Sequence, residues 1–335
     1  MRDFQGDGPA RLAEGLAAGD RRALARAITL VESQRPDHRL AARDLLGRLP
    51  QRERPALRVG LTGTPGVGKS SFTEELGMML TSRGLKLAVL AVDPSSARSG
   101  GSILGDKTRM ERLSRAPLAF IRPSPSQAAL GGVGRRTRET VLVAEAWGAD
   151  VVLIETVGVG QSETLVAEMT DVFVLLLAPA GGDELQGVKR GIMELADIIL
   201  VNKADGTLEP VARMTCADYA GALRLMRGRP DDPEGYPMAL CVSAITGKGL
   251  DEAWAAVERL AEGRIATGAF AARRKAQAER WFRDALESGF LARLHADPAI
   301  AAREATLAVE VAAGRLAPDA AAETLLDAVL PDARR

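Results

Sequence analysis

The sequence predicts an α/β protein in which a mostly parallel β-sheet is flanked by helices, with a helical extension at each end of the chain. From residue 56 to about 265, short and nearly continuous apolar runs alternate with helical patterns, which is typical of a parallel sheet that is covered on both faces. The two ends of the chain instead repeat their apolar residues at helical spacing. We therefore expect an N-terminal helical extension (1–54), a central domain (55–268) and a C-terminal helical arm (269–335).

The expected elements follow one another along the chain. Near the N-terminus, Pro36 interrupts the helical pattern of 9–48 and predicts two helices. In the C-terminal arm, apolar residues recur at helical spacing at Trp281, Phe282, Leu286, Phe290 and Leu294. The expected strands are LRVGL (57–61), LKLAVLAV (85–92), LAFI (118–121), VVLIE (151–155), VFVLLLA (172–178), IILVN (198–202) and MALCVS (238–243).

Composition and charge argue against several classes of protein. With 335 residues, 46% of them hydrophobic, the chain can bury a sizeable core. Its 44 basic residues balance 44 acidic ones, so overall charge favours neither nucleic acid nor an anionic membrane as a partner. The N-terminal sequence has no apolar signal-peptide segment, and VFVLLLAPA (172–180) is too short to cross a bilayer. We expect a soluble protein of the cytoplasm.

The cysteines and histidines are few and scattered. Cys216, Cys241, His38 and His295 have neither the spacing of a zinc site nor that of a disulfide framework. We expect the two cysteines to be free thiols in the core.

The segment GTPGVGKSS matches the phosphate-binding pattern G-x-x-x-x-G-K-[ST] and lies between an expected strand and the expected helix SFTEELGMML (71–80). Its glycines let backbone N–H groups face phosphate oxygens at the positive end of that helix. Lys69 then reaches the β- and γ-phosphates, and the Ser70 hydroxyl meets Mg²⁺. The alternative is a Gly-rich turn that binds nothing. The motif predicts a P-loop NTPase and a nucleotide site made of Gly63, Thr64, Pro65, Gly66, Val67, Gly68, Lys69, Ser70 and Ser71.

The segment NKAD follows the sixth expected strand and predicts which base is bound. The Asp205 carboxylate can accept two hydrogen bonds from the N1–H and N2–H₂ donors that guanine has and adenine lacks. Lys203 would lie across the ring plane, and Asn202 would hold the loop together. After the last strand, SAITGKG could add backbone N–H groups of Ser243 and Ala244 that face guanine O6. A polar turn without a ligand is the alternative for NKAD alone, but its place in the sheet favours GTP over ATP.

Three carboxylates complete the expected phosphate end of the site. Asp93, Asp106 and Glu155 follow or end strands whose loops lie at the same edge of a parallel sheet as Ser70. Mg²⁺ prefers such hard oxygen ligands, so Ser70, Asp93, Asp106 and Glu155 are the expected metal ligands. The small residues of 95–101 would let this segment move when phosphate is lost. The alternative is a solvated loop in which Asp106 caps a helix.

These segments together resemble a known family. LTGTPGVGKSSF, AVDPSS…GGSILGDKTRM, IETVGVGQSE, GGDELQGVKRGIMELAD, NKAD and SAITGKG are similar to the MeaB/MMAA/ArgK-type GTPases of the SIMIBI class of P-loop proteins. GDRRALARAITLVES near the N-terminus and the C-terminal arm also fit, so the resemblance covers nearly the whole chain.

The resemblance implies a GTP-hydrolysing chaperone of an adenosylcobalamin-dependent acyl-CoA mutase, usually methylmalonyl-CoA mutase. Such a protein gates cofactor delivery and protects or rescues the mutase, with GTP, GDP and Mg²⁺ as its ligands. It also implies a homodimer formed through the helical arm, 270–335. A helical hairpin packed on its own subunit is the alternative for the arm. Methylmalonyl-, ethylmalonyl- and hydroxyisobutyryl-CoA mutases all remain open as the partner.

The resemblance also assigns roles in hydrolysis. In ETVG, Gly158 is placed to sense the γ-phosphate through its backbone N–H. Ras-like GTPases follow that glycine with a glutamine that orients water; here Val159 takes its place, so we expect slow hydrolysis without a partner, and Gln161 is a candidate substitute. The expected catalytic residues are Lys69, Glu155, Gly158 and Lys189.

The segment PAGGDELQGVKRG (179–191) resembles an additional switch of the family. Lys189 could neutralise charge on the phosphates, as an arginine finger does. A solvated helix start, whose dipole Asp183 and Glu184 complement, is the alternative. The candidate switch residues are Asp183, Glu184, Lys189 and Arg190.

Three other functions remain open. A metal-insertion GTPase of the HypB or UreG kind would require a Cys/His cluster, which the scattered cysteines and histidines do not supply. An ArgK-like transport-coupled ATPase or kinase would prefer ATP, against which Asp205 argues. A nucleotide-binding protein that never hydrolyses is compatible with Val159.

Overall fold

The computed structural model describes residues 8–50, 52–92, 110–122, 130–156, 162–179, 190–226 and 228–329. The chain divides into two compact units, Met1–Gln277 and Ala278–Arg335. The first unit contains the β-sheet, and the second is helical. The expected division at residues 54 and 268 stays a prediction.

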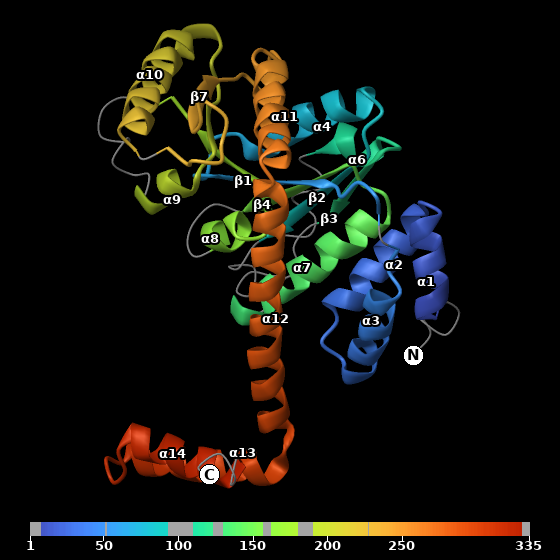
Figure 1. The fold of residues 1–335 in the computed structure, drawn as a ribbon, viewed down its shortest axis with the longest axis vertical. Coiled ribbons are helices and arrows are strands. Elements are labelled where there is room, and N and C mark those ends of the chain that lie inside the picture. The colour runs from blue at the N-terminus through green and yellow to red at the C-terminus, as the bar shows by residue number, and fades with distance from the viewer. Residues whose placement is uncertain are drawn as a thin grey trace. The chain divides into compact units, whose positions relative to one another are not determined.

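The described part of the first unit forms a seven-stranded parallel sheet in the order β3-β2-β4-β1-β5-β6-β7 (Figure 1). All neighbouring strands pair in parallel, so the predicted α/β fold with a parallel sheet is confirmed. The central strand β1 lies between β4 and β5, where the strand order reverses, and ligands of such sheets bind beyond the carboxyl ends of the strands at this point. The strands are β1 (Leu57–Gly63), β2 (Leu87–Val92), β3 (Ala119–Arg122), β4 (Val151–Thr156), β5 (Val172–Leu177), β6 (Ile198–Val201) and β7 (Met238–Cys241).

Helices cover both faces of the sheet, which explains why its strands are apolar throughout. On one face, alternate strand residues such as Leu61, Leu153 and Val174 join a buried cluster with α4 (Lys69–Ser82), α6 (Glu111–Arg115) and α11 (Leu250–Ala266). Figure 1 shows these three helices on one side of the sheet and α7 and α8 on the other. The remaining helices that contact the strands are α7 (Leu130–Ala146), α8 (Ser162–Ala167), α9 (Arg190–Leu195) and α10 (Glu209–Leu225), the last preceded by the short 3₁₀ turn η2 (Gly206–Leu208).

The N-terminal segment forms three helices that pack on one another and on α7. They are α1 (Pro9–Ala17), α2 (Arg21–Glu32) and α3 (Pro36–Gly47). The predicted break at Pro36 is confirmed, but the prediction of two helices is wrong. A second break lies at Gly19, whose φ is +74°, and Asp20, whose side chain caps α2 by accepting from the N–H groups of Arg22 (2.8 Å) and Ala23 (3.3 Å). In the sequence, Gly19 is a signal for the end of one helix and Asp20 is a signal for the start of the next. Helical periodicity alone does not detect such a break.

The C-terminal arm is helical, as expected. Helix α12 (Ala269–Ala296) begins in the first unit and continues into the second, which also holds α13 (Pro298–Ala312) and α14 (Pro318–Val329). Within the second unit, α13 and α14 pack together around an apolar hollow lined by Leu307, Val311 and Leu325. Phe282 and Leu286 of α12 are exposed. Among the described residues, no helix has the length and apolar content that a membrane span requires.

Candidate nucleotide-binding site

Four loops at the carboxyl edge of the sheet bring most of the predicted site residues together. Gly63 ends β1, residues 64–68 form the following loop, and Lys69, Ser70 and Ser71 open α4. Glu155 lies near the end of β4. The segment 202–205 follows β6, and Ser243 and Ala244 follow β7. Parallel pairing directs all four connections to one edge, as the sequence predicts.

The loop after β1 requires glycine at two positions. A Cβ on Gly63 would lie 2.2 Å from the carbonyl oxygen of Leu176, which belongs to the neighbouring strand β5. Gly68 has a φ of +90° and precedes α4, and a Cβ there would lie 2.8 Å from Nδ2 of Asn202. These glycines let the chain turn sharply into α4. The first turn of that helix has N–H groups without intrahelical partners, and such groups bind phosphate.

Lys69 is buried and its ammonium group folds back onto its own loop. Its Nζ donates hydrogen bonds to the carbonyl oxygens of Gly63 (2.6 Å) and Thr64 (3.2 Å). Burial lowers the pKa of Lys69, and the negative charges of Glu155 and Glu163 partly offset that effect. The role of Lys69 toward the phosphates stays a prediction.

Glu155 and Ser70 carry side-chain oxygen atoms at this edge. The Glu155 carboxylate is buried, and Thr73 of α4 donates to it from Oγ1 at 3.2 Å. Hydroxyl and carboxylate oxygens suit Mg²⁺, so these two residues fit that ion. The other two predicted ligands, Asp93 and Asp106, lie outside the described residues. The described part of the chain contains no cluster of three His, Cys, Asp or Glu side chains that could hold a metal.

Asn202 connects three of the loops. Its Nδ2 donates to the carbonyl oxygen of Val67 at 2.8 Å, and its Oδ1 accepts from the N–H of Ala244 at 3.1 Å. The neighbouring Lys203 has a φ of +59°, and its Nζ donates to the carbonyl oxygen of Gly66 at 2.8 Å. The loop after β6 is therefore fixed against both the phosphate-binding loop and the loop after β7.

Asp205 is held by a neighbouring hydroxyl. Oγ of Ser243 donates to its carboxylate and accepts from the N–H of Thr246 at 3.1 Å. The predicted guanine contacts of the Ser243 and Ala244 amides meet competition, because Ser243 N–H donates to the carbonyl oxygen of Lys248 at 2.9 Å and Ala244 N–H donates to Asn202. A role of these two amides toward the base stays a prediction.

Several of the predicted catalytic and switch residues lie outside the described ranges. Outside the described residues lie Gly158, Val159, Gln161, Asp183, Glu184 and Lys189, and nothing in the structure tests their roles. The described chain resumes at α8 after the first of these segments and at α9, which starts with Arg190, after the second.

Sequence reasoning missed three threonines at the site. Besides Thr73, which donates to Glu155, Thr62 and Thr156 join the ends of β1 and β4 through hydroxyl groups 2.7 Å apart. Thr62 and Thr156 lie within the segments LTGTPGVGKSSF and IETVGVGQSE, but neither has an assigned role there, and Thr73 lies outside every quoted motif. Only the pairing of β1 with β4 brings Thr62 and Thr156 together, so no local signal could have revealed them.

Comparisons with known proteins found similar sequences and a similar fold. A family model described as methylmalonyl Co-A mutase-associated GTPase MeaB matches residues 24–299. A Caulobacter vibrioides protein that is named only as a GTPase is 54% identical over 318 residues, covering 93% of this chain and 95% of its own. The mouse protein named methylmalonic aciduria type A homolog, mitochondrial, is 47% identical over 328 residues, which are 95% of this chain and 79% of that protein.

A solved structure extends the similarity to the fold. A protein described as a LAO/AO transport system kinase superposes with a TM-score of 0.73 at 37% sequence identity. The match covers 96% of this chain and 97% of the other. The similarity therefore extends over nearly the whole of both chains.

Proposed function

This chain belongs to the family of methylmalonyl-CoA mutase-associated GTPases represented by MeaB, and on that premise we propose that it is a GTP-hydrolysing chaperone of an adenosylcobalamin-dependent acyl-CoA mutase. In this proposal it gates the loading of the cofactor and protects or reactivates the mutase. Methylmalonyl-CoA mutase is the first candidate partner. The observation that carries the proposal is the family match over 24–299, supported by the name of the mouse relative.

The chain's own residues account for recognition of the nucleotide. The amides of the loop after β1 and the first turn of α4 bind phosphate oxygens, and Lys69 moves from the carbonyl groups of its loop to the β- and γ-phosphates. Asp205, oriented by Ser243, accepts from guanine. When bound, Mg²⁺ neutralises charge on the phosphate oxygens. Ser70 and Glu155 would hold that ion together with Asp93 and Asp106.

Hydrolysis by the isolated protein is slow in this proposal, because Val159 occupies the place of a water-orienting glutamine. Contact with the mutase completes the site. Gly158 senses the γ-phosphate through its N–H, and Lys189 neutralises developing charge. The segments 157–161 and 179–191 then act as switches whose arrangement depends on whether GTP or GDP is bound.

The partner surfaces include a second copy of the chain. Phe282, Leu286 and Phe290 are exposed at intervals of four residues along α12, so they form one apolar stripe on the helix. We assign this stripe to a homodimer interface, in line with the family resemblance. The cytoplasmic location and the lack of nucleic-acid and membrane partners stay predictions from the sequence.

The alternative functions have less support. A metal-insertion GTPase would need a Cys/His cluster, which the two scattered cysteines and two scattered histidines of the sequence do not supply. A transport-coupled kinase or ATPase is the function that the description of the similar solved structure suggests, but a carboxylate at Asp205 selects guanine rather than adenine.

Nucleotide-dependent binding to the mutase tests the proposal. The purified protein is loaded with a non-hydrolysable GTP analogue or with GDP, and its affinity for methylmalonyl-CoA mutase is measured by calorimetry. We expect a difference of about tenfold or more between the two states, since a switch must couple binding to nucleotide state. Lys69→Ala is the control, because it removes phosphate binding and should bind the mutase equally under both conditions.

Equal affinity in both nucleotide states, or no binding to any adenosylcobalamin-dependent acyl-CoA mutase, would contradict the proposal. GTP hydrolysis itself would stand in either case, because it rests on family membership and not on the identity of the partner.

A further inference from the structure

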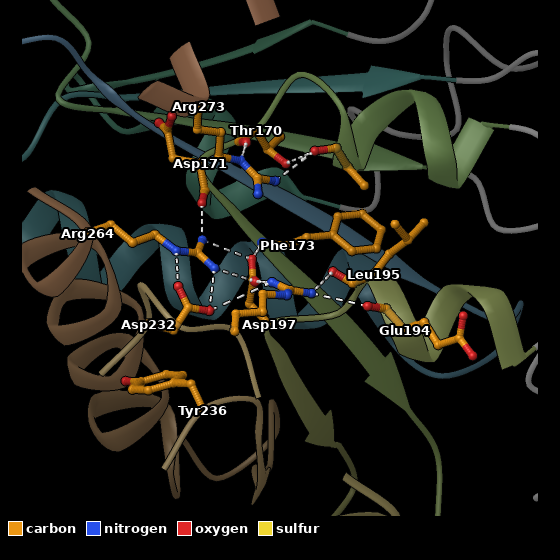
Figure 2. Close-up of polar contacts among 12 residues, drawn as sticks. Thr170, Asp171, Phe173, Glu194, Leu195, Asp197, Asp232, Tyr236, Arg264 and Arg273 are labelled. Atoms are coloured by element: carbon orange, nitrogen blue, oxygen red, sulfur yellow. Dashed lines mark hydrogen bonds and ion pairs between the residues drawn. The ribbon is translucent and has the colours of Figure 1, made fainter. Parts of the chain in front are cut away.

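A second buried polar cluster lies at the opposite edge of the sheet, where β5 and β6 begin (Figure 2). Its centre is Asp197, which is fully buried and precedes β6. Arg264 of α11 pairs with Asp197 at 2.7 Å and with Asp232 at 2.6 Å, and donates to the carbonyl oxygen of Asp171 at 2.5 Å. Asp197 also accepts from the N–H of Phe173 in β5 at 2.7 Å. This Arg–Asp network therefore fixes the starts of two neighbouring strands.

One arm of the Arg–Asp network reaches the end of α9. Arg229 pairs with Asp197, and its NH2 group donates to the carbonyl oxygens of Glu194 (3.1 Å) and Leu195 (3.2 Å). These are the last two residues of α9. The final carbonyl groups of a helix have no intrahelical partner and carry a partial negative charge, so the guanidinium group caps the helix.

A second arm caps the end of α8 in the same way. Arg273 donates from NH2 to the carbonyl oxygen of Ala167, the last residue of α8, at 3.0 Å, and from Nε to that of Thr170 at 2.8 Å. Gln277 adds a bond to the same Thr170 oxygen at 2.9 Å. The next residue, Asp171, accepts from Arg264, so this arm joins the Arg–Asp network through one peptide unit.

The two capped helices share a place in the chain relative to the proposed switches. Each is six residues long, and helices of that length need tertiary contacts to be stable. Helix α8 starts directly after 157–161 and α9 at the end of 179–191, the two segments that we assign as switches. Both helices thus lead from a switch segment at their amino ends to an arginine of one network at their carboxyl ends.

We propose that Arg229 and Arg273 are positioning residues for GTP hydrolysis, which act by fixing the carboxyl ends of α9 and α8, the two helices that follow the segments we assign as switches. Both caps connect to Arg264 and Asp197: Arg229 pairs with Asp197 directly, and Arg273 holds Thr170, whose neighbour Asp171 accepts from Arg264. The inference rests on the proposed switch role of the two segments.

Arg274 offers a matched control on the same turn of α12. It pairs with Asp171 at 2.6 Å and with Glu145 at 3.0 Å, and donates to the carbonyl oxygen of Ala56 at 2.7 Å. The contacts described for it involve neither α8 nor α9. Removing Arg274 therefore disturbs the same cluster of buried charges while leaving both helix caps in place.

The test is GTP hydrolysis under single-turnover conditions, without a mutase, for Arg229→Gln, Arg273→Gln and Arg274→Gln. We expect the first two to lower the rate of the hydrolysis step by about tenfold or more, because small displacements at a reacting centre are costly, and to keep the GDP affinity of the wild type. All three Gln variants should lower the midpoint of thermal unfolding to a similar extent. Arg274→Gln, however, should keep the wild-type rate of GTP hydrolysis. Arg229→Lys and Arg273→Lys, which retain the charge and a donor, should recover part of the rate.

Three results would overturn the inference: wild-type rates in both Gln variants, a loss of rate in Arg274→Gln equal to theirs, or losses in rate that are matched by losses of GDP affinity. If the Gln variants do not fold, the Lys variants carry the same comparison. The double variant Arg229→Gln/Arg273→Gln tests whether the two caps act through one network. Caps that work through one network should give a combined loss smaller than the product of the single losses, whereas a full product would mean that they act independently. Failure of the mutase proposal leaves this test untouched, since no mutase is present.

Discussion

The side chain of Asp205 is held by the loop that follows β7. Ser243 donates to its carboxylate and is itself fixed by the Thr246 amide. Both motifs were predicted from the sequence, since NKAD and SAITGKG are local patterns. The hydrogen bond between Ser243 and Asp205 could not be predicted in this way, because it depends on the pairing of β6 with β7.

Asp205→Asn should lower the affinity for GTP by at least about 100-fold, since one of the two hydrogen bonds from guanine loses its acceptor and the other is no longer charge-assisted. The amide should also relax discrimination against xanthosine triphosphate, whose O2 can accept from it. Equilibrium binding of fluorescent GTP and xanthosine triphosphate measures both effects. Ser243→Ala is the control: it loosens Asp205 and should weaken GTP binding by about tenfold without changing the preference. Unchanged GTP affinity in Asp205→Asn would remove Asp205 from base recognition.

At the scale of elements, the sequence predicts the strands far better than the contacts between them. All seven apolar runs form strands, and most of them are buried, although the edge strand β7 is only partly buried. The Arg–Asp network was not predicted, because Arg264 and Asp197 lie 67 residues apart and no motif marks either of them. Asn202 is a similar case. The motif NKAD identifies it as a site residue, but the sequence does not predict its hydrogen bond to the Val67 carbonyl oxygen.

The Arg–Asp network predicts a particular response to acid. Burial alone would raise the pKa of Asp197, but Arg264 and Arg229 outweigh it, so the pKa of Asp197 is lowered. The folded state then binds this proton at lower pH than the unfolded chain, and the free energy of unfolding falls as pH falls below about 5. Urea unfolding across this range should show a steeper loss in the wild type than in Asp197→Asn.

At neutral pH, Asp197→Asn should cost about 3 kcal/mol of unfolding free energy, because it leaves buried guanidinium groups without their counter-charge. Asp37→Asn is the matched control. Asp37 pairs with Arg35 on the surface, where both side chains are more than half exposed, and solvent screens such a pair. Equal stability of wild type and Asp197→Asn at neutral pH would refute the structural role assigned to Asp197.

At the scale of the whole molecule, we expect a dimer built through α12. The double variant Leu286→Ser/Phe290→Ser removes two members of its exposed apolar stripe, which lie on one helix face. Light scattering coupled to gel filtration should give about twice the chain mass of 35.4 kDa for the wild type and a single chain mass for the variant.

Leu225→Ser tests whether the effect is specific, since Leu225 is 90% exposed but belongs to the first unit; it should leave the dimer intact. A monomeric wild type, or a Leu286→Ser/Phe290→Ser variant that stays dimeric, would contradict the assignment of the apolar stripe to a dimer interface. The sequence predicted the helices of this arm but left a dimer interface and an intrachain hairpin equally open, because periodicity identifies an apolar face and not its occupant.

The central claim is that this GTPase serves a mutase, and steady-state hydrolysis tests it most directly. GTP and ATP turnover is measured with Mg²⁺, alone and with an excess of each adenosylcobalamin-dependent acyl-CoA mutase. We predict slow turnover of GTP in preference to ATP, and a strong increase in the GTP rate with one mutase. A rate that stays flat with every mutase, or a preference for ATP, would contradict the account.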